Sequence, residues 1–312
     1  MASISMKLIE IFLIFTILYK KAAMIFLLYG MAVFSFGYSF LAQASTELRF
    51  FTHDGKQLLF GDPKESALEF AILEKNRFRG KVGNFIHIVS LLKGPLSVDV
   101  GVDAMMVGTF HGEDDWETPL DSIDGKIGGY LEFRNGRFQT KASFEHLSAH
   151  LSDGKFRGSI PPLSHDEKAL LGYDANENLY AIRLTENFSN YSREFLKFIV
   201  SYKVLNTKLY LGLSRTVHIS EPSELKSRYG PSYQAGFETT LKLFHFPLPF
   251  FISSDFQWKH EHNYLLEQNH HLGLDLKGFR PFANYYEGFD QRGIYWDLKE
   301  QYLALGLSFP MY

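Results

Sequence analysis

Most of the chain after residue 66 alternates between apolar and polar positions with a period of two. The pattern is clearest on either side of Asn135-Gly136, where Leu, Phe and Ala alternate with Glu, Gln and Lys. Successive side chains of a β-strand point to opposite faces, so this pattern predicts strands with one apolar and one polar face. Asn-Gly is a strong hairpin signal because a type I′ turn needs positive φ at both residues. We predict a hairpin in which Arg134 faces Arg137 and Phe133 faces Phe138.

The same alternation recurs in further segments as far as Phe309. A second hairpin is predicted around Asn206-Thr207, and its apolar residues again share one face. Segments counted from about residue 67 give about twelve strands, an even number as in bacterial transmembrane barrels. Short turns, such as that around Gly94, alternate with long polar connections, such as 152–189. Soluble sandwiches also alternate in hydropathy, but this succession of turns favours an all-β transmembrane antiparallel barrel.

The last predicted strand, residues 302–309, has an apolar face made of Leu303, Leu305, Leu307 and Phe309. A C-terminal strand that ends on an aromatic residue resembles the assembly signal of bacterial outer-membrane proteins. That resemblance implies the barrel-assembly machinery as a partner, which would act through this strand. Pro310-Met311-Tyr312 extends beyond Phe309, so Tyr312 is an alternative terminal aromatic residue.

The N-terminus is the one strongly continuous apolar part of the sequence. Two apolar runs, 8–19 and 24–41, flank Lys20-Lys21, and the second ends in Ala42-Gln43-Ala44. A basic pair, an apolar run and a small-x-small site are the parts of a secretory signal peptide, so cleavage is predicted after Ala44. A two-helix membrane anchor is the alternative, since the second run has about the length of a short spanning helix. We therefore predict a signal peptide at 1–44, a periplasmic leader at 45–66 and an outer-membrane barrel at 67–312.

Composition fits this prediction. Aromatic residues make up 16% of the 312 residues, yet the mean hydropathy is only -0.12, as expected if aromatic and charged residues alternate along strands. The absence of cysteine excludes disulfides, cysteine-ligated zinc and thiol nucleophiles. A net charge of -3 gives no sign of nucleic acid as a partner. The expected surroundings are the lipids of a bacterial outer membrane, and no oligomeric state is assigned.

Polar residues interrupt the apolar face of two consecutive strands. Parity places His146, Ser148 and His150 on the outward face of the first strand, near the outer rim of an apolar band about 25 Å tall. Ser192 and Glu194 fall on the outward face of the next strand, again at its outer end. Consecutive strands usually pair, so we expect these five side chains to converge at the level of the outer leaflet.

A hydroxyl, an imidazole and a carboxylate that converge have the composition of a serine-hydrolase site. We assign Ser148 as the nucleophile, His146 as the base within hydrogen-bonding reach, and Glu194 as the carboxylate that holds the imidazole. The secondary candidates are His150, Ser192, Arg193 and Asp153. Among them, Arg193 would stabilise an oxyanion or a lipid phosphate. The alternative is a polar interfacial collar with no catalytic role.

Two other groups could hold a metal. His260, His262, His270 and His271 crowd one connection, but their spacing matches no fixed ligand pattern. An acidic segment formed by residues 113–115 with Asp121 and Asp124 is a candidate for calcium, but a solvated loop is the favoured explanation. We therefore assign no metal ligand and no cofactor, and leave calcium open.

The same segments resemble an uncharacterised family of exported bacterial proteins. Its elements read here as Gly61-Asp62-Pro63-Lys64-Glu65, the segment from His146 to Gly154, and Ser192-Arg193-Glu194; Ala149, Ser152 and Gly154 depart from its pattern. A more distant likeness is to outer membrane phospholipase A and the lipid A deacylase, which place His-x-Ser on a lipid-facing strand. Their His-x-Ser is usually followed by Asn, whereas Ala149 stands here. This likeness implies hydrolysis of lipid esters.

Three hypotheses follow for the function. The first is a lipid-ester hydrolase with a lipid-facing site, and the others are a non-catalytic adhesin or structural surface protein and a small channel. Charged residues predicted to line the lumen are Glu132, Lys141, Glu145, Lys197 and Asp255. A barrel of about twelve strands filled by such side chains argues against a wide pore.

Overall fold

The computed structural model describes residues 47–52, 61–65, 67–74, 76–112, 120–151, 190–219, 230–242, 248–276, 279–293 and 298–309. The chain divides into two compact units, Met1–Glu47 and Leu48–Tyr312. Apart from Glu47, all of the described residues belong to the second unit. The predicted signal peptide lies outside the described residues.

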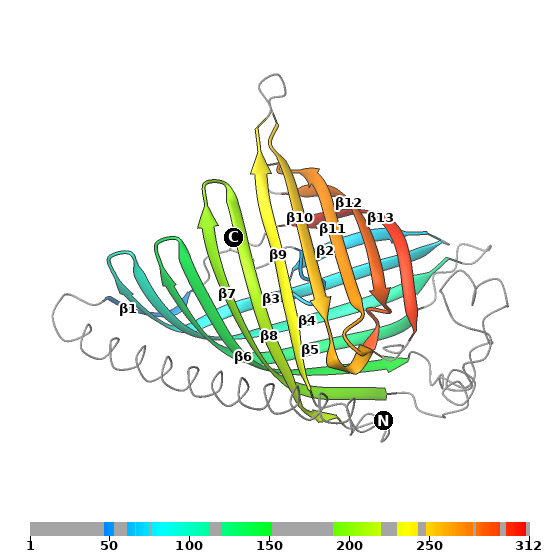
Figure 1. The fold of residues 1–312 in the computed structure, drawn as a ribbon, viewed down its shortest axis with the longest axis horizontal. Helices are drawn as coiled ribbons and strands as arrows, with labels where there is room; N and C mark the ends of the chain where they lie inside the picture. Colours follow the sequence, from blue (N-terminus) through cyan, green and yellow to red (C-terminus); the bar gives the residue numbers. More distant parts are fainter. Residues whose placement is uncertain are drawn as a thin grey trace, which may run out of the picture. The chain divides into compact units, whose positions relative to one another are not determined.

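The second unit is built from antiparallel strands connected in sequence order (Figure 1). The strands are β1 (Glu47–Thr52), β2 (Leu68–Leu73), β3 (Arg77–Lys93), β4 (Leu96–His111), β5 (Leu120–Asn135), β6 (Phe138–Leu151), β7 (Asn190–Val204), β8 (Thr207–Ile219), β9 (Pro231–Leu241), β10 (Phe250–Trp258), β11 (Leu266–Leu274), β12 (Arg280–Phe289) and β13 (Lys299–Phe309). A 3₁₀ helix, η3 (His260–His262), connects β10 to β11. Among the described residues, no helix is long and apolar enough to cross a membrane.

The sheet closes on itself. Strand β2 pairs with β3 on one side and with β13 on the other, where Leu305 lies opposite Ile72. Strands β2 to β13 thus form a closed barrel of 12 antiparallel strands, as the alternation predicted. Strand β1 pairs with β3 in addition. Closure leaves the wall with no free edge between its first and last strands, which is what a sheet in lipid requires.

The two predicted hairpins form, but each turn differs by one residue from the prediction. At the first turn Asn135 pairs with Phe138, and Phe133 pairs with Thr140 rather than with Phe138. Gly136, with φ of 59°, is the first central residue of the loop, where a type II′ turn needs its single positive φ. At the second turn Val204 pairs with Thr207. When a turn moves by one residue, the partner of each strand residue changes by two positions. Two positions along a strand lie on the same face, so the predicted faces are unchanged.

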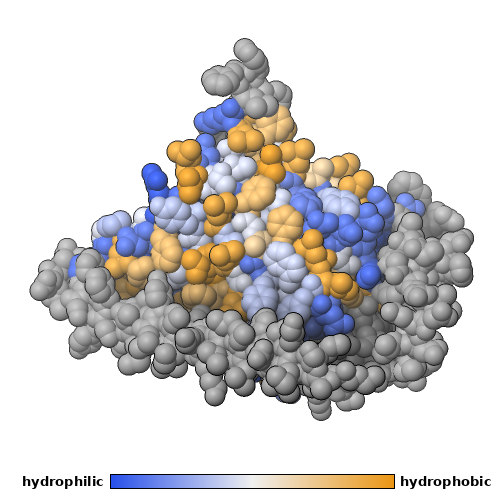
Figure 2. Space-filling model, in the orientation of Figure 1, coloured by the Kyte–Doolittle hydropathy of each residue, from blue (hydrophilic) through white to orange (hydrophobic). Residues whose placement is uncertain are grey.

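The barrel has its apolar side chains outside and its polar side chains inside. Outward leucines are largely exposed, with Leu305 at 68% and Leu211 at 67%, and apolar side chains are spread over the surface of the strands (Figure 2). The inward face holds buried charges, including Glu132, Lys141, Glu145 and Asp255; Lys197, the fifth residue predicted to line the lumen, is 13% exposed and pairs there with Asp62. This is the reverse of a soluble protein and is the pattern of a barrel whose outer surface contacts lipid.

Ion pairs fill the lumen. Asp103 of β4 accepts from Lys126 and from Lys141, each at 3.3 Å, and Lys126 also lies 3.4 Å from Glu145. All four side chains are at most 6% exposed. Buried charges are tolerated only when they are paired, and here each strand supplies partners to its neighbours.

Part of the predicted leader, residues 61–65, lies within the lumen. The backbone NH of Gly61 donates to Glu238 of β9, and its carbonyl accepts from Asn269 of β11. On the other side, the Pro63 carbonyl accepts from Lys81 of β3 at 3.4 Å. Glu65 lies 3.7 Å from Lys141 of β6. A segment that bonds to strands around the whole barrel must lie inside it, so the leader crosses the lumen before it enters β2.

Candidate functional site

Three polar side chains form a row across neighbouring strands on the outward face. In the register of the sheet, His146 of β6 lies opposite Glu194 of β7, and Glu194 lies opposite His218 of β8. The side chain of Glu194 is 22% exposed, whereas His146 is 41% and His218 is 62% exposed. The row therefore lies on the surface that faces lipid, as parity predicted for His146 and Glu194.

Glu194 joins the two imidazoles. Its Oε1 lies 2.8 Å from Nδ1 of His146, and its Oε2 lies 2.6 Å from Nδ1 of His218. A carboxylate only accepts, so each ring carries its proton on Nδ1 and leaves Nε2 as an acceptor. The arrangement orients both rings and stabilises a positive charge on either one.

His218 was missed by sequence reasoning because of a β-bulge. Counting from the turn after Val204, strict alternation places Val217 outward and His218 inward. The pairing shifts between Glu194 and Phe195, which leaves Val217 as the extra residue on β8. One extra residue reverses the parity of everything beyond it, so His218 turns outward to Glu194. No pattern in the sequence marks this bulge.

Ser148 lies beside this row on β6 and is only partly exposed. Its hydroxyl forms a hydrogen bond with Nε2 of His150, at 2.6 Å. Ser192 of β7 lies directly opposite Ser148 on the same outward face. The predicted hydrogen bond from Ser148 to His146 is not present among the described residues. The structure thus brings the predicted residues together on one face, with Ser148 turned to His150 and His146 turned to Glu194.

Arg193 lies on the other face of the wall. Its side chain is buried in the lumen, where it forms an ion pair with Glu261 of η3. Adjacent residues of a strand point to opposite faces, so Arg193 cannot reach an oxyanion at Ser148. The expectation that it would do so was wrong. Asp153 lies outside the described residues.

Sequence reasoning also missed a second outward Ser–His pair, on β10 and β11. The Ser254 hydroxyl lies 2.9 Å from Nδ1 of His270, and Nε2 of His270 lies 3.3 Å from Oε1 of Gln268. Gln268 in turn donates to Glu287. Ser254 itself is only 7% exposed, so its hydroxyl is poorly placed to meet a bulky ester. The alternation of β10 and β11 could have found this pair, since Ser254 and His270 occupy outward positions.

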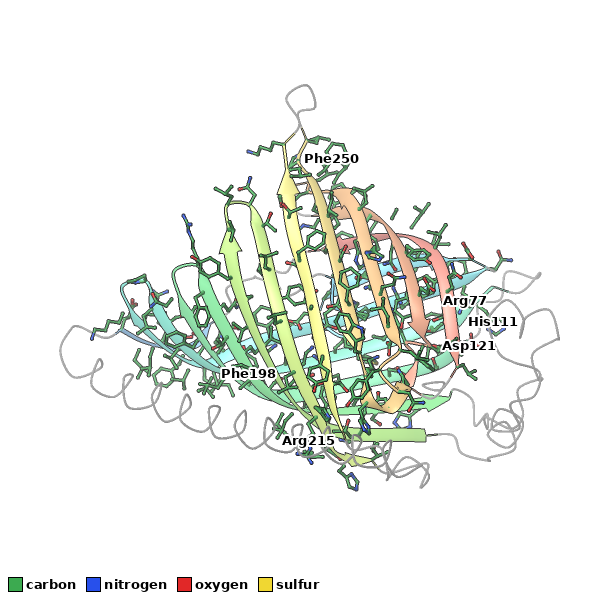
Figure 3. The ribbon with its side chains drawn as sticks, in the orientation of Figure 1. Arg77, His111, Asp121, Phe198, Arg215 and Phe250 are labelled. Carbon is green, nitrogen blue, oxygen red and sulfur yellow. The ribbon has the colours of Figure 1, made fainter. Side chains whose placement is uncertain are left out.

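The candidate metal groups are dispersed. His271 points into the lumen beside Ser253, whereas His270 is outward, and His262 pairs with Glu267. Asp121 pairs with His111 at 2.8 Å, near one end of the barrel (Figure 3). Residues 113–115 lie outside the described residues. Within the described parts of the chain, no group of three His, Cys, Asp or Glu is arranged to hold a metal ion.

Comparisons with known proteins find a likeness in fold. No protein-family model and no curated protein matches the chain. The outer membrane phospholipase of Salmonella typhi, solved as a dimer with bound calcium, aligns over 78% of this chain and 89% of its own, at 10% identity and a TM-score of 0.53. Outer membrane phospholipase A from Escherichia coli aligns over 78% of this chain and 95% of its own, at 11% identity and a TM-score of 0.51. Such identities show the fold alone.

These findings and the geometry of the wall agree. The barrel is closed, its outward face is apolar, and its structural neighbours are outer-membrane proteins. The distant likeness to outer membrane phospholipase A, expected from the sequence, is confirmed at the level of the fold. The chain is an integral β-barrel of a bacterial outer membrane.

Proposed function

We propose that this barrel is a lipid-ester hydrolase that acts on lipids of the outer membrane through Ser148. The observation that carries the proposal is the lipid-facing row of His146, Glu194 and His218, with Ser148 and His150 beside it. A carboxylate and three imidazoles on a lipid-exposed surface cost free energy, and ionisable residues in such places usually have a functional role. The structural neighbours named as phospholipases support the same class of reaction.

Ser148 is the proposed nucleophile. Its oxygen attacks the ester carbonyl carbon while an imidazole Nε2 takes the hydroxyl proton, and that proton then passes to the leaving alcohol. Water hydrolyses the acyl-enzyme through the same base. His146 is the proposed base, because Glu194 orients it and stabilises its charged form. Rotation of Ser148 about its Cα–Cβ bond moves the hydroxyl from His150 on one side towards His146 on the other.

The residues around Ser148 suit an ester in a membrane. Ser192, directly opposite, is the proposed donor to the oxyanion in place of Arg193. One row further into the membrane, Phe144 and Leu196 are about half exposed and offer an apolar surface to an acyl chain. Arg215 of β8 continues that row (Figure 3).

The Salmonella typhi neighbour binds calcium, but in the described parts of this chain no cluster of ligands fits such an ion. The barrel-assembly machinery remains the proposed partner of β13, whose apolar face is exposed.

Alanine variants of the two histidines test the choice of base. In a deacylation assay with phospholipid and lipid A in mixed micelles, His146→Ala lowers kcat by about a hundredfold or more, the usual contribution of a general base. His150→Ala lowers kcat by less than about tenfold, since His150 has no carboxylate partner among the described residues. The rate of fatty-acid release measures both.

Two outcomes would count against this assignment. A larger loss in His150→Ala than in His146→Ala would make His150 the base and leave His146 with a structural role. No release of fatty acid by the refolded wild-type chain, from either lipid and with or without calcium, would favour a non-catalytic surface protein. Migration of the unheated folded barrel on a denaturing gel controls for folding in every variant.

A further inference from the structure

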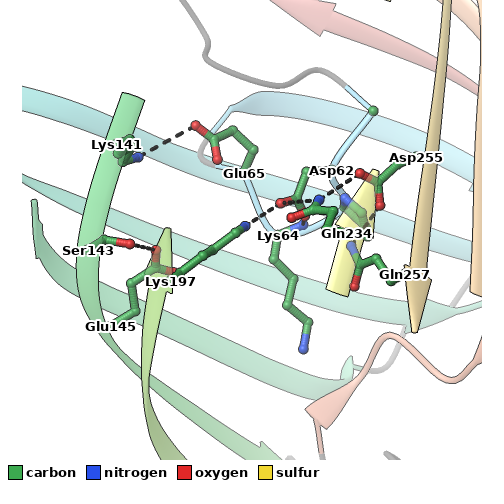
Figure 4. A network of polar contacts seen from close by, with 12 residues as sticks. Asp62, Lys64, Glu65, Lys141, Ser143, Glu145, Lys197, Gln234, Asp255 and Gln257 are labelled. Carbon is green, nitrogen blue, oxygen red and sulfur yellow. Dashed lines mark hydrogen bonds and ion pairs between the residues drawn. The ribbon is translucent and has the colours of Figure 1, made fainter. Parts of the chain in front are cut away.

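Lys64, in the leader segment inside the lumen, has an ammonium group with no ion-pair partner among the described residues. Its backbone NH donates to Asp62, but among the described residues its side chain makes no hydrogen bond or ion pair. Figure 4 shows the Lys64 side chain directed away from the polar network formed by Asp62, Gln234 and Asp255. Lys64 is partly exposed, and a cation that is largely removed from water is normally paired.

Lys64 lines two cavities in the lumen. The second cavity lies between the leader, the first residues of β7, the last of β8 and η3, which is the end of the barrel where Glu194 also lies. Its wall includes the hydroxyls of Ser214 and Thr216, which have no hydrogen-bond partner among the residues that the structure describes. An ammonium and two hydroxyls thus offer donors to one space.

The other charges of this second cavity are matched. Lys197 pairs with Asp62. Arg193 pairs with Glu261, and Lys259 pairs with Glu267 at 2.6 Å. Once these pairs are formed, Lys64 is the cation of this cavity that has no ion pair among the described residues; Asp124, which lines the first cavity, interacts with Lys64 electrostatically but forms no ion pair with it.

The electrostatic surroundings of Lys64 are positive on balance. Burial, followed by the nearby charges of Arg193 and Lys259, lowers the pKa of Lys64 to about 7, while Asp124 and Glu261 oppose this with smaller effects. Burial disfavours a charge of either sign, but the nearby cations Arg193 and Lys259 favour an anion here.

We propose that the cavity beside Lys64 binds a small free oxyanion such as inorganic phosphate. Lys64 supplies the charge, and Ser214 and Thr216 supply neutral donors. The barrel wall separates the lumen from lipid, so the ligand is water-soluble and not a membrane lipid. The site is distinct from the row around Glu194, which faces the opposite side of the wall.

Titration calorimetry of the full chain in zwitterionic detergent, at pH 6.5 and constant ionic strength, tests this site with inorganic phosphate. We expect saturable binding in the wild type, a loss of at least about tenfold in affinity in Lys64→Met, and retention in Lys64→Arg. Lys203→Met is the matched control, because Lys203 is exposed beside the Val204 turn at the other end of the barrel. It should bind phosphate as the wild type does.

A second measurement needs no ligand in the site. Without phosphate, the folded wild-type chain releases the Lys64 proton above about pH 7, whereas the unfolded chain keeps it to about pH 10.5. Stability attributable to Lys64 is therefore lowest below pH 7 and rises between these values. Lys64→Met should lack this rise, and phosphate should reduce it in the wild type.

Several results would overturn the proposal. Equal phosphate binding by Lys64→Met and the wild type would place any site elsewhere. Absence of binding in the wild type would exclude the site, and so would binding of short-chain phosphatidic acid in the micelle without binding of inorganic phosphate. If the pH dependence of unfolding were the same in Lys64→Met and the wild type, Lys64 would not carry the unpaired charge on which the proposal depends.

Discussion

Replacement of Ser148 by alanine is expected to abolish release of fatty acid, with a loss of at least about a thousandfold in kcat. The reason is chemical. Among the described side chains of the cluster, the other neutral hydroxyl is that of Ser192, and no imidazole lies directly opposite Ser192. Loss of the attacking oxygen leaves only binding and charge stabilisation. KM should change little, since the substitution removes one atom from the surface.

Ser254→Ala is the matched control for this experiment. Ser254 is also an outward serine that contacts a histidine, but it is buried and lies on β10. It should retain wild-type activity. Activity that persists in Ser148→Ala and is lost in Ser254→Ala would transfer the site to His270 and Gln268. Activity that survives both substitutions would refute a serine nucleophile at either place.

Replacement of Asp62 by alanine is expected to lower the free energy of unfolding by about 3–5 kcal/mol, the cost of removing one member of a buried ion pair. Asp62 is 1% exposed and accepts from Lys197 and from Gln234. Without it, Lys197 stays in the lumen without its carboxylate, and the leader loses its main contact with β7 and β9. Denaturant titration of the barrel in lipid vesicles measures the change.

A second substitution separates charge from packing. Asp62→Ala combined with Lys197→Met removes both charges, and most of the lost stability should return. Asp275→Ala breaks the pair with Arg280, whose two side chains are 26% and 27% exposed, and should cost no more than about 1 kcal/mol. If Asp62→Ala lowers the free energy of unfolding as little as Asp275→Ala does, the contacts of the leader in the lumen do not stabilise the barrel.

Much of the fold could be predicted from alternation alone. Leu303, Leu305 and Leu307 share a face because side chains alternate along a strand, and lipid selects that face. The number of strands followed from the same pattern. The register at Gly136 could not be predicted, because Asn-Gly fits two turns that differ by one residue, and neither changes the faces.

Part of the candidate site could likewise be predicted from the sequence, and part could not. Parity alone placed His146, Ser148 and Glu194 outward, since no bulge interrupts the pairing of β6 with β7. The hydrogen bond of Ser148 depends on a side-chain rotation that no pattern encodes, and the turn of His218 towards Glu194 depends on a bulge. The first is a side-chain contact within β6, and the second is a contact between β7 and β8.

The barrel and its apolar outer face follow from the sequence pattern, as does the face of each strand residue up to the bulge at Val217, because alternation is a local property of strands. The entry of the leader into the lumen, the ion pair of Asp62 with Lys197, and a Lys64 with no ion pair among the described residues follow from the tertiary structure. The ion pair of Asp62 joins residues more than a hundred positions apart. These features depend on the closure of the wall, which brings the inward charges of distant strands into one space.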